Sequence, residues 1–303
     1  MDAAERALLE EALRKTLTTS GPGAEPDAAL AELGWAEMLT QEPDIAIPLV
    51  FRLLGETGAQ APVLNDVVLL AAGRPLGGTP PLPYAGGVWV RWARGAGAPA
   101  GPLDPGLPLR HAEPGDLRAA AVAAGRRALG WWLLGTGRAM LTLAREHVVD
   151  REQFGRPLAS FQALRHRLAE TYVALEAAEA VLVAAGSAET GSVGREDSGA
   201  LEGNGALDDC GAPGNLTAWH KGDAPEGTGA LLAKAAAGRA ALTAARHCQQ
   251  ALGGIGFTAE HALHRHVKRA LVLDGLLGST RELTREAGRL LLRETRAPRL
   301  VDL

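Results

Sequence analysis

The segment from Asp116 to Val149 is the feature that most constrains the fold of this chain. It is a run of about 33 residues, rich in Ala and Leu, that starts directly after Pro114-Gly115. Ala and Leu are strong helix formers, whereas strands favour β-branched and aromatic residues. We therefore expect one helix of roughly 50 Å, with Asp116 as its N-cap.

The rest of the C-terminal half repeats this pattern. The 303-residue sequence is 47% hydrophobic but only 4% aromatic, which again favours packed helices over sheets. The further helices that we expect here are Phe161–Ala185, Gly229–Leu252, Glu260–Leu277 and a short terminal helix, Thr280–Arg296. Long helices joined by short connections pack as antiparallel bundles, so the sequence predicts a four-helix bundle over residues 116–303.

The N-terminal part is expected to be a smaller helical domain, residues 1–73. Apolar residues recur at helical spacing in four segments of it. These segments are Asp2–Leu17, Asp27–Leu33, Pro43–Leu54 and Ala61–Gly73.

Two segments break the helical pattern. Residues 74–115 are dense in Pro and Gly, and only Gly87–Ala93 alternates as a strand does; one hairpin, or an edge strand with a partner, is the most that we expect there. Ser187–Thr228 is rich in Gly, Ser, Asp, Glu and Asn. Such a composition buries too little apolar surface to order itself, so we expect a flexible insertion.

Charge and cysteine content exclude several classes of protein. The net charge is −4 and the pI is near 6.1, so no global basic field points to nucleic acid or anionic lipid. The cysteines, Cys210 and Cys248, lie far apart without a metal-ligand interval, which favours free thiols in a reducing compartment. The N-terminus lacks the apolar core of a signal peptide and no long uncharged apolar run follows. We expect a cytoplasmic protein.

Two motifs lie in order on these predicted helices. The first, RxQFG followed by PLxxFQ, occupies the turn between the first two bundle helices. The second, QxxGGxGFT, ends the third. The residues that form them are Arg151, Gln153, Phe154, Gly155, Pro157, Leu158, Phe161 and Gln162, then Gln250, Gly253, Gly254, Gly256, Phe257 and Thr258.

With these motifs the chain resembles the acyl-CoA dehydrogenase family, over roughly Asp116–Leu292 apart from the insertion. A weaker likeness at Leu30–Trp35 and Ala61–Gly73 extends it to the N-terminal helices. The resemblance implies a mainly α fold: the C-terminal four-helix bundle of the family, a reduced N-terminal helical domain and a residual β-hairpin segment in place of the middle β-barrel.

The resemblance also implies FAD, bound across a subunit interface. By this resemblance, the residues expected to contact the cofactor are Arg151, Gln153, Phe154, Gln250, Gly253 and Gly254. A planar guanidinium grips phosphate oxygens in a fork, and glycines allow the backbone to approach a flat ligand. The alternative is that Arg151 and Gln153 only cap one helix while Gly253-Gly254 ends another.

The catalytic part of the family pattern is missing. Residues 74–115 are too few for a β-barrel that would cradle the flavin ring. The family's catalytic glutamate falls on Leu277, and its alternative position falls on Gly125; neither residue is a carboxylate. Asp274, one helical turn before Leu277, is a weak candidate for a displaced base, and a capping or surface role is favoured for it.

The sequence leaves three hypotheses for function. The first is an acyl-CoA dehydrogenase-family subunit that completes the FAD site of a heteromeric enzyme without catalysing α,β-desaturation itself; such enzymes typically act on fatty-acyl or sterol side-chain substrates. The second is a flavin-free scaffold or regulatory protein, and the third is a self-sufficient dehydrogenase with a displaced base. His261 and His264 share a helical face, but we expect no metal site there.

Overall fold

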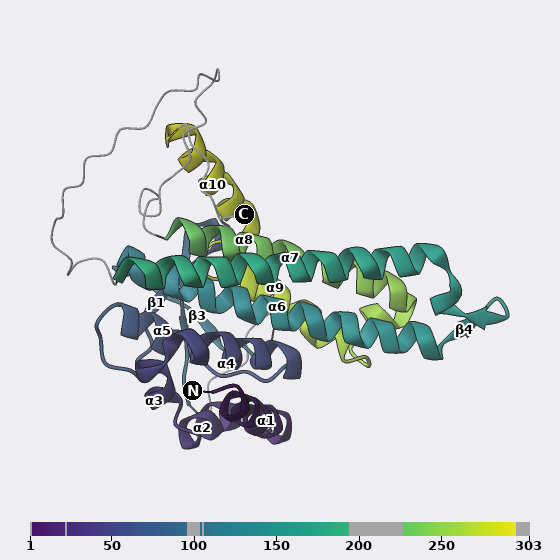
Figure 1. Ribbon diagram of the computed structural model, residues 1–303, viewed down its shortest axis with the longest axis horizontal. Coiled ribbons are helices and arrows are strands. Elements are labelled where there is room, and N and C mark those ends of the chain that lie inside the picture. Colours follow the sequence, from purple (N-terminus) through teal and green to yellow (C-terminus); the bar gives the residue numbers. More distant parts are fainter. Residues whose placement is uncertain (1, 22, 96–103, 105, 194–226, 295–303) are drawn as a thin grey trace, which may run out of the picture.

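The computed structural model describes residues 2–21, 23–95, 104, 106–193 and 227–294, and the described chain is mainly helical (Figure 1). The predicted fold class is therefore confirmed. The N-terminal helices are α1 (Ala3–Thr19), α2 (Glu25–Glu32), α3 (Trp35–Gln41), α4 (Pro43–Thr57) and α5 (Leu64–Ala71). The C-terminal helices are α6 (Ala119–Asp150), α7 (Gln162–Val193), α8 (Thr228–Leu252), α9 (Leu263–Gly275) and α10 (Thr280–Glu294).

Helix α6 is the central element of the fold. It packs against α7, α8 and α9 on the bundle side and against α4 and α5 of the N-terminal part. A helix enclosed in this way is apolar on most of its faces, and buried residues accordingly run from Ala121 to Val148. The predicted N-cap is wrong, because α6 begins after Arg118, whose side chain makes no capping bond; Asp116 lies outside the helix.

The crossing of α4 and α6 is unusually close. A Cβ atom on Gly135 would lie 2.1 Å from the backbone oxygen of Arg52, and one on Gly55 would lie 2.4 Å from the backbone nitrogen of Thr136. Only glycine fits at such a backbone contact. Trp132 fills the adjacent core, with its ring 5.5 Å from that of Trp92 and 5.6 Å from that of Phe51.

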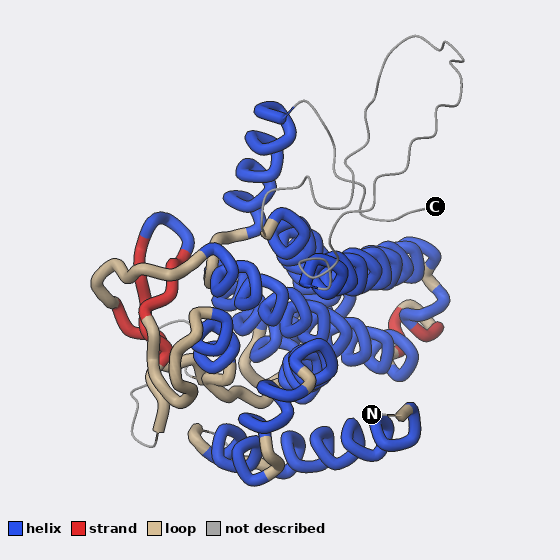
Figure 2. The backbone as a smooth tube through the Cα atoms, turned by 60° about the vertical axis from the view of Figure 1, so that its left-hand side comes forward, coloured by secondary structure: helices blue, strands red, loops and turns tan. Residues whose placement is uncertain are grey.

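The middle segment forms more sheet than the sequence predicted. Strands β1 (Pro81–Tyr84) and β2 (Val88–Trp92), joined by the one-turn helix η1 (Ala85–Gly87), make the expected hairpin, but β3 (Leu109–His111) adds a third antiparallel strand. Three residues are too short to show alternation, so this strand had no sequence signal. Figure 2 shows the sheet on one side of the helices.

A second, very short hairpin turns the chain from α6 into α7. It consists of β4 (Glu152–Gln153) and β5 (Arg156–Pro157) and is followed by the one-turn helix η2 (Leu158–Ser160). Helix α7 is longer than expected, because it continues to Val193. The predicted insertion at 187–228 is thus helical at its start, and residues 194–226 of it lie outside the described residues.

Three further expectations have different outcomes. Among the described residues, none of the helices has the length and apolar character that a membrane span requires. Cys248 is a free buried thiol, while Cys210 lies outside the described residues. The division into domains 1–73, 74–115 and 116–303 stays a prediction.

Candidate functional site

The α6–α7 hairpin presents the first motif at the surface. Its turn residues, Phe154 and Gly155, have φ values of 55° and 75°, which is the backbone that a two-residue hairpin turn requires. Leu158 N–H donates to the Arg151 carbonyl oxygen over 2.8 Å and closes the hairpin. The turn projects the Phe154 side chain outward, so that it is 87% exposed.

Arg151 and Gln153 are exposed on this hairpin. Arg151 is the C-cap residue of α6, and its backbone N–H bonds to His147. The capping interpretation therefore holds for its backbone. Within the part of the chain that the structure describes, no side-chain hydrogen bond or ion pair occupies Arg151 or Gln153, so both side chains are available to a ligand.

The second motif is equally open. Helix α8 ends at Gly253, with φ 64° and ψ −140°, and continues as the short helix η3 (Gly253–Phe257). A Cβ atom on Gly253 or Gly254 would meet no other atom within 4 Å. Gln250 is exposed, and its Oε1 accepts a hydrogen bond from Arg167 of α7.

The two motifs lie at the same end of the bundle within one chain (Figure 1). The antiparallel order of α6, α7 and α8 places the end of α6, the start of α7 and the end of α8 together. The Arg167–Gln250 bond ties the last two, and the rings of His147 and His261 lie 6.3 Å apart. Burial and the neighbouring His261 lower the pKa of His147. This end of the bundle carries all six predicted cofactor residues.

The two predicted base positions also meet, but in the interior. Leu277 is 1% exposed. A Cβ atom on Gly125 would lie 2.4 Å from Cδ1 of Leu277 and 3.0 Å from Cγ2 of Val68. The space above Gly125 is thus filled by apolar side chains, and neither position offers a group that accepts a proton.

Backbone contacts hold Leu277 in this place despite an unfavourable conformation. Its φ is 55°, a left-handed value that is uncommon for a leucine. Its N–H donates to the Pro83 carbonyl oxygen over 2.8 Å, and its carbonyl oxygen accepts from Arg126 Nε over 3.0 Å. Tyr84 forms an isolated bridge with Leu276, so the end of β1 supports the same loop.

Asp274 serves as a cap. Its Oδ1 accepts hydrogen bonds from the backbone N–H of Thr280, over 3.1 Å, and from the Thr280 hydroxyl. The first of these bonds satisfies a backbone N–H in the first turn of α10, which has no partner within the helix. These contacts are of the kind expected for a capping residue, and the carboxylate oxygen that bonds Thr280 is already engaged.

Lys234 of α8, for which the sequence raised no expectation, is fully buried beside this loop. Its ammonium group donates to the carbonyl oxygens of Asp274, over 2.9 Å, and Gly278. Burial lowers the pKa of Lys234 to about 7. A single cation within the Ala-rich run of residues 230–238 was the available signal.

Comparison with known proteins gives the family. The model of the acyl-CoA dehydrogenase C-terminal domain matches residues 117–200 and 215–289. The chain belongs to the acyl-CoA dehydrogenase family, a family of FAD-dependent oxidoreductases.

Three similar proteins illustrate the relationship. Acyl-CoA dehydrogenase IpdE2 of Mycobacterium tuberculosis is 32% identical over 209 residues, which are 66% of this chain and 53% of that protein. The chain therefore spans about half the length of this curated relative. The ChsE4–ChsE5 complex from M. tuberculosis is similar with a TM-score of 0.59 and 18% identity over 98% of this chain and 99% of that one. A glutaryl-CoA dehydrogenase from Mycobacterium smegmatis in complex with FADH2 has a TM-score of 0.62 and 14% identity. The match covers 99% of this chain and 97% of that one. At these identities the two structures show the fold alone.

The residues present fit one half of FAD and not the other. At the bundle end, an unpaired guanidinium and two open glycines suit a pyrophosphate and a flat adenosine group. At the catalytic positions, Leu277 and Val68 fill the space beside Gly125, and the described part of the middle segment forms three short strands rather than a barrel.

Proposed function

We propose that this chain is a non-catalytic subunit of a heteromeric acyl-CoA dehydrogenase, in which it completes the FAD site of a catalytic partner. The observation that carries the proposal is the contrast between its open nucleotide-binding motifs and its filled base positions. A chain built in this way is suited to contribute the nucleotide-binding motifs to a shared site. It has no carboxylate at the base positions.

The chain's own residues would act on the nucleotide end of FAD. Arg151 would bind the pyrophosphate, with Gln153 and Phe154 beside it on the hairpin. Gln250 and the backbone at Gly253-Gly254 would close over the adenosine half. FAD, when bound, supplies the acceptor for the β-hydride during α,β-desaturation. The partner subunit would contribute the cradle for the flavin ring and the carboxylate base.

The similarity to solved structures supports a heteromer. One neighbour in fold is a complex of two differently named proteins, ChsE4 and ChsE5, and another is described with FADH2. We propose by analogy that the flavin here is shared across a subunit interface, and that the substrate of the assembly is a fatty-acyl or sterol side-chain CoA thioester.

A simple experiment separates the three hypotheses. The chain is purified alone and after co-expression with a second subunit of the same family, and the absorbance near 450 nm is recorded. Flavin only in the co-purified pair supports the proposal. Flavin in the chain alone supports a self-sufficient dehydrogenase, and no flavin in either preparation supports a scaffold.

A further inference from the structure

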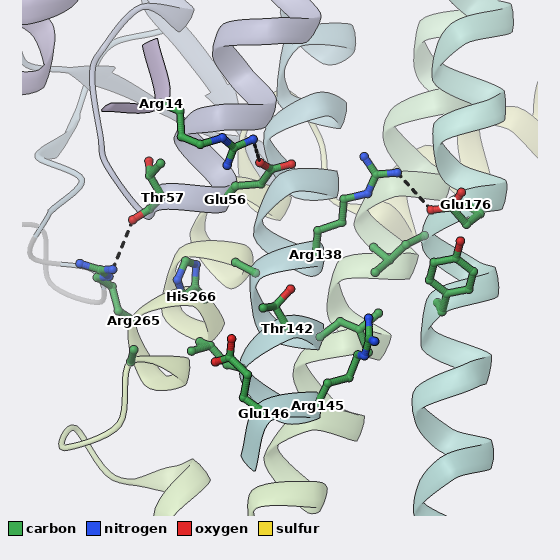
Figure 3. Close-up of a pocket in the computed structure, with 16 residues that line it drawn as sticks. Arg14, Glu56, Thr57, Arg138, Thr142, Arg145, Glu146, Glu176, Arg265 and His266 are labelled. Carbon is green, nitrogen blue, oxygen red and sulfur yellow. Dashed lines mark hydrogen bonds and ion pairs between the residues drawn. The ribbon is translucent and has the colours of Figure 1, made fainter. Parts of the chain in front are cut away.

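A groove lies between the N-terminal helices and the bundle, along the side of α6 (Figure 3). Its volume is about 580 Å³, within the range of small-molecule sites. Its walls come from α1, from the end of α4, from α7 and from the start of α9. None of the residues in the two family motifs lines it.

Two arginines form fixed walls of the groove. Arg14 lies 2.7 Å from a carboxylate oxygen of Glu56. Arg138 lies 2.5 Å from Glu179 and 3.1 Å from Glu176. Because these guanidinium groups are already paired with carboxylates, they shape the groove and add little net charge to it.

Two further arginines line the groove without an ion-pair partner among the described residues, and Glu146 is a carboxylate of the same lining. Within the described residues, Arg265 has no carboxylate at ion-pair distance, and its Nη2 reaches only the Thr57 carbonyl oxygen at 3.4 Å. Arg145, on the same groove (Figure 3), has no ion-pair or hydrogen-bond partner in the part of the chain that is described. An arginine without a carboxylate is suited to bind an oxyanion.

His266 is the most unusual group in the groove. It is only 4% exposed, yet its Nδ1 has no hydrogen-bond partner among the described residues. Burial, together with Arg265 and Arg269, lowers the pKa of His266 to about 4, so the imidazole is neutral at pH 7 and has one nitrogen that donates. A buried polar atom without a partner costs free energy unless a ligand or water satisfies it.

We propose that this groove binds a small organic anion, whose carboxylate or phosphate group is held by Arg265 and His266. Arg265 supplies the charge, and the His266 ring, whose Nδ1 is buried in the free chain, turns to donate one hydrogen bond from Nδ1–H. The body of the ligand lies along α6 toward Tyr172. The site is separate from the proposed flavin contacts, so it does not depend on the function proposed above.

Three probes that share one ring test this site. Benzoate and phenyl phosphate differ only in the anionic group, and benzamide is their neutral counterpart. Each is titrated against the chain at constant ionic strength, while the Tm and the calorimetric heat of binding are measured. We expect at least one of the two anions to bind saturably and raise the Tm, because a ligand that binds the folded state stabilises it; benzamide should do neither. The stronger of the two anions identifies the group that the site prefers.

Two variants locate the binding. Arg265→Gln removes the charge but keeps most of the side chain, and should weaken binding of the preferred anion at least tenfold. His266→Phe should also weaken it, while Arg74→Ala, at an exposed arginine outside the groove, should leave it unchanged. Failure of both anions to bind, or equal binding by benzamide or by Arg265→Gln, overturns the proposal. If His266→Phe does not fold, the anion affinities of Arg265→Gln and Arg74→Ala still show whether the anion binds in this groove.

Discussion

The end of the bundle and the interior around Gly125 differ in how closely they are packed. At the bundle end, Gly253 and Gly254 face open space, and Arg151 is exposed without a side-chain partner among the described residues. Around Gly125, a leucine and a valine occupy the space where a base would act. On the proposed function, the open end would take the nucleotide half of FAD, while the interior around Gly125 is packed as ordinary core.

On the proposed function, this difference would let a subunit hold the nucleotide end of FAD without acting as the catalyst. Open glycines and an unpaired arginine contribute little to the stability of an isolated chain. A buried leucine contributes a great deal. We therefore expect substitutions in the two regions to separate flavin binding from stability.

The largest effect is expected for Leu277→Ala. Alanine keeps a Cβ atom, so the strain of the positive φ is nearly unchanged and the substitution mainly creates a cavity. Such cavities cost about 2–5 kcal/mol of unfolding free energy. Urea denaturation of the chain alone measures this loss. Leu292→Ala, at an exposed position, is the control, and its unfolding free energy should be nearly unchanged. A loss below about 1 kcal/mol would show that the interior is loosely packed.

Arg151→Ala should mainly affect flavin. The loss of a charge-assisted hydrogen bond to phosphate costs roughly 1.5–3 kcal/mol, which is about ten- to a hundredfold in affinity. The flavin content of the co-purified complex should fall accordingly, while the Tm of the chain alone stays the same. Arg74→Ala is the control. Unchanged flavin content together with a lower Tm would make Arg151 a structural residue.

A pair of glycine substitutions compares the two regions directly. Gly125→Ala forces a Cβ atom against Leu277 and should cost up to about 2 kcal/mol, because overpacking exceeds the gain in helix propensity. The Cβ atom added by Gly254→Ala meets no neighbouring atom. This substitution should therefore change stability by less than about 0.5 kcal/mol, yet reduce the flavin content of the complex. Denaturation and flavin absorbance of both variants test this, and the reverse pattern would contradict the comparison.

A further effect, on the pH dependence of stability, concerns Lys234. Its pKa is about 7 in the folded chain and 10.5 for an ordinary lysine. Between these values the unfolded chain binds a proton that the folded chain does not, so stability should rise with pH by about 1 kcal/mol per unit. Burial is the main cause; Asp274 and Glu282 oppose the shift and Arg126 adds to it. Denaturation at pH 7 to 10 should show a smaller slope for Lys234→Met than for the wild type. Equal slopes would mean that Lys234 is charged in the folded chain.

The sequence predicted most of the helices because their apolar periodicity is long and regular, but it missed α3 (Trp35–Gln41), which spans only seven residues. Single residues were harder to predict. Strand β3 is only three residues long, and Asp116 seemed a suitable cap although α6 begins three residues later. The filling of the space beside Gly125 by Leu277 and Val68, the burial of Lys234 and the lack of a described partner for His266 Nδ1 result from contacts between segments far apart in the chain. Apart from the single cation in the Ala-rich run around Lys234, no local pattern reports such contacts.

A structure of the co-purified heteromer tests the central claim most directly. The account predicts the adenosine and pyrophosphate of FAD against Arg151 and the Gly253-Gly254 end of this chain, with the flavin ring and its base in the partner subunit. A flavin ring lying beside Leu277 in this chain, or a complex whose FAD touches neither Arg151 nor these glycines, would contradict it.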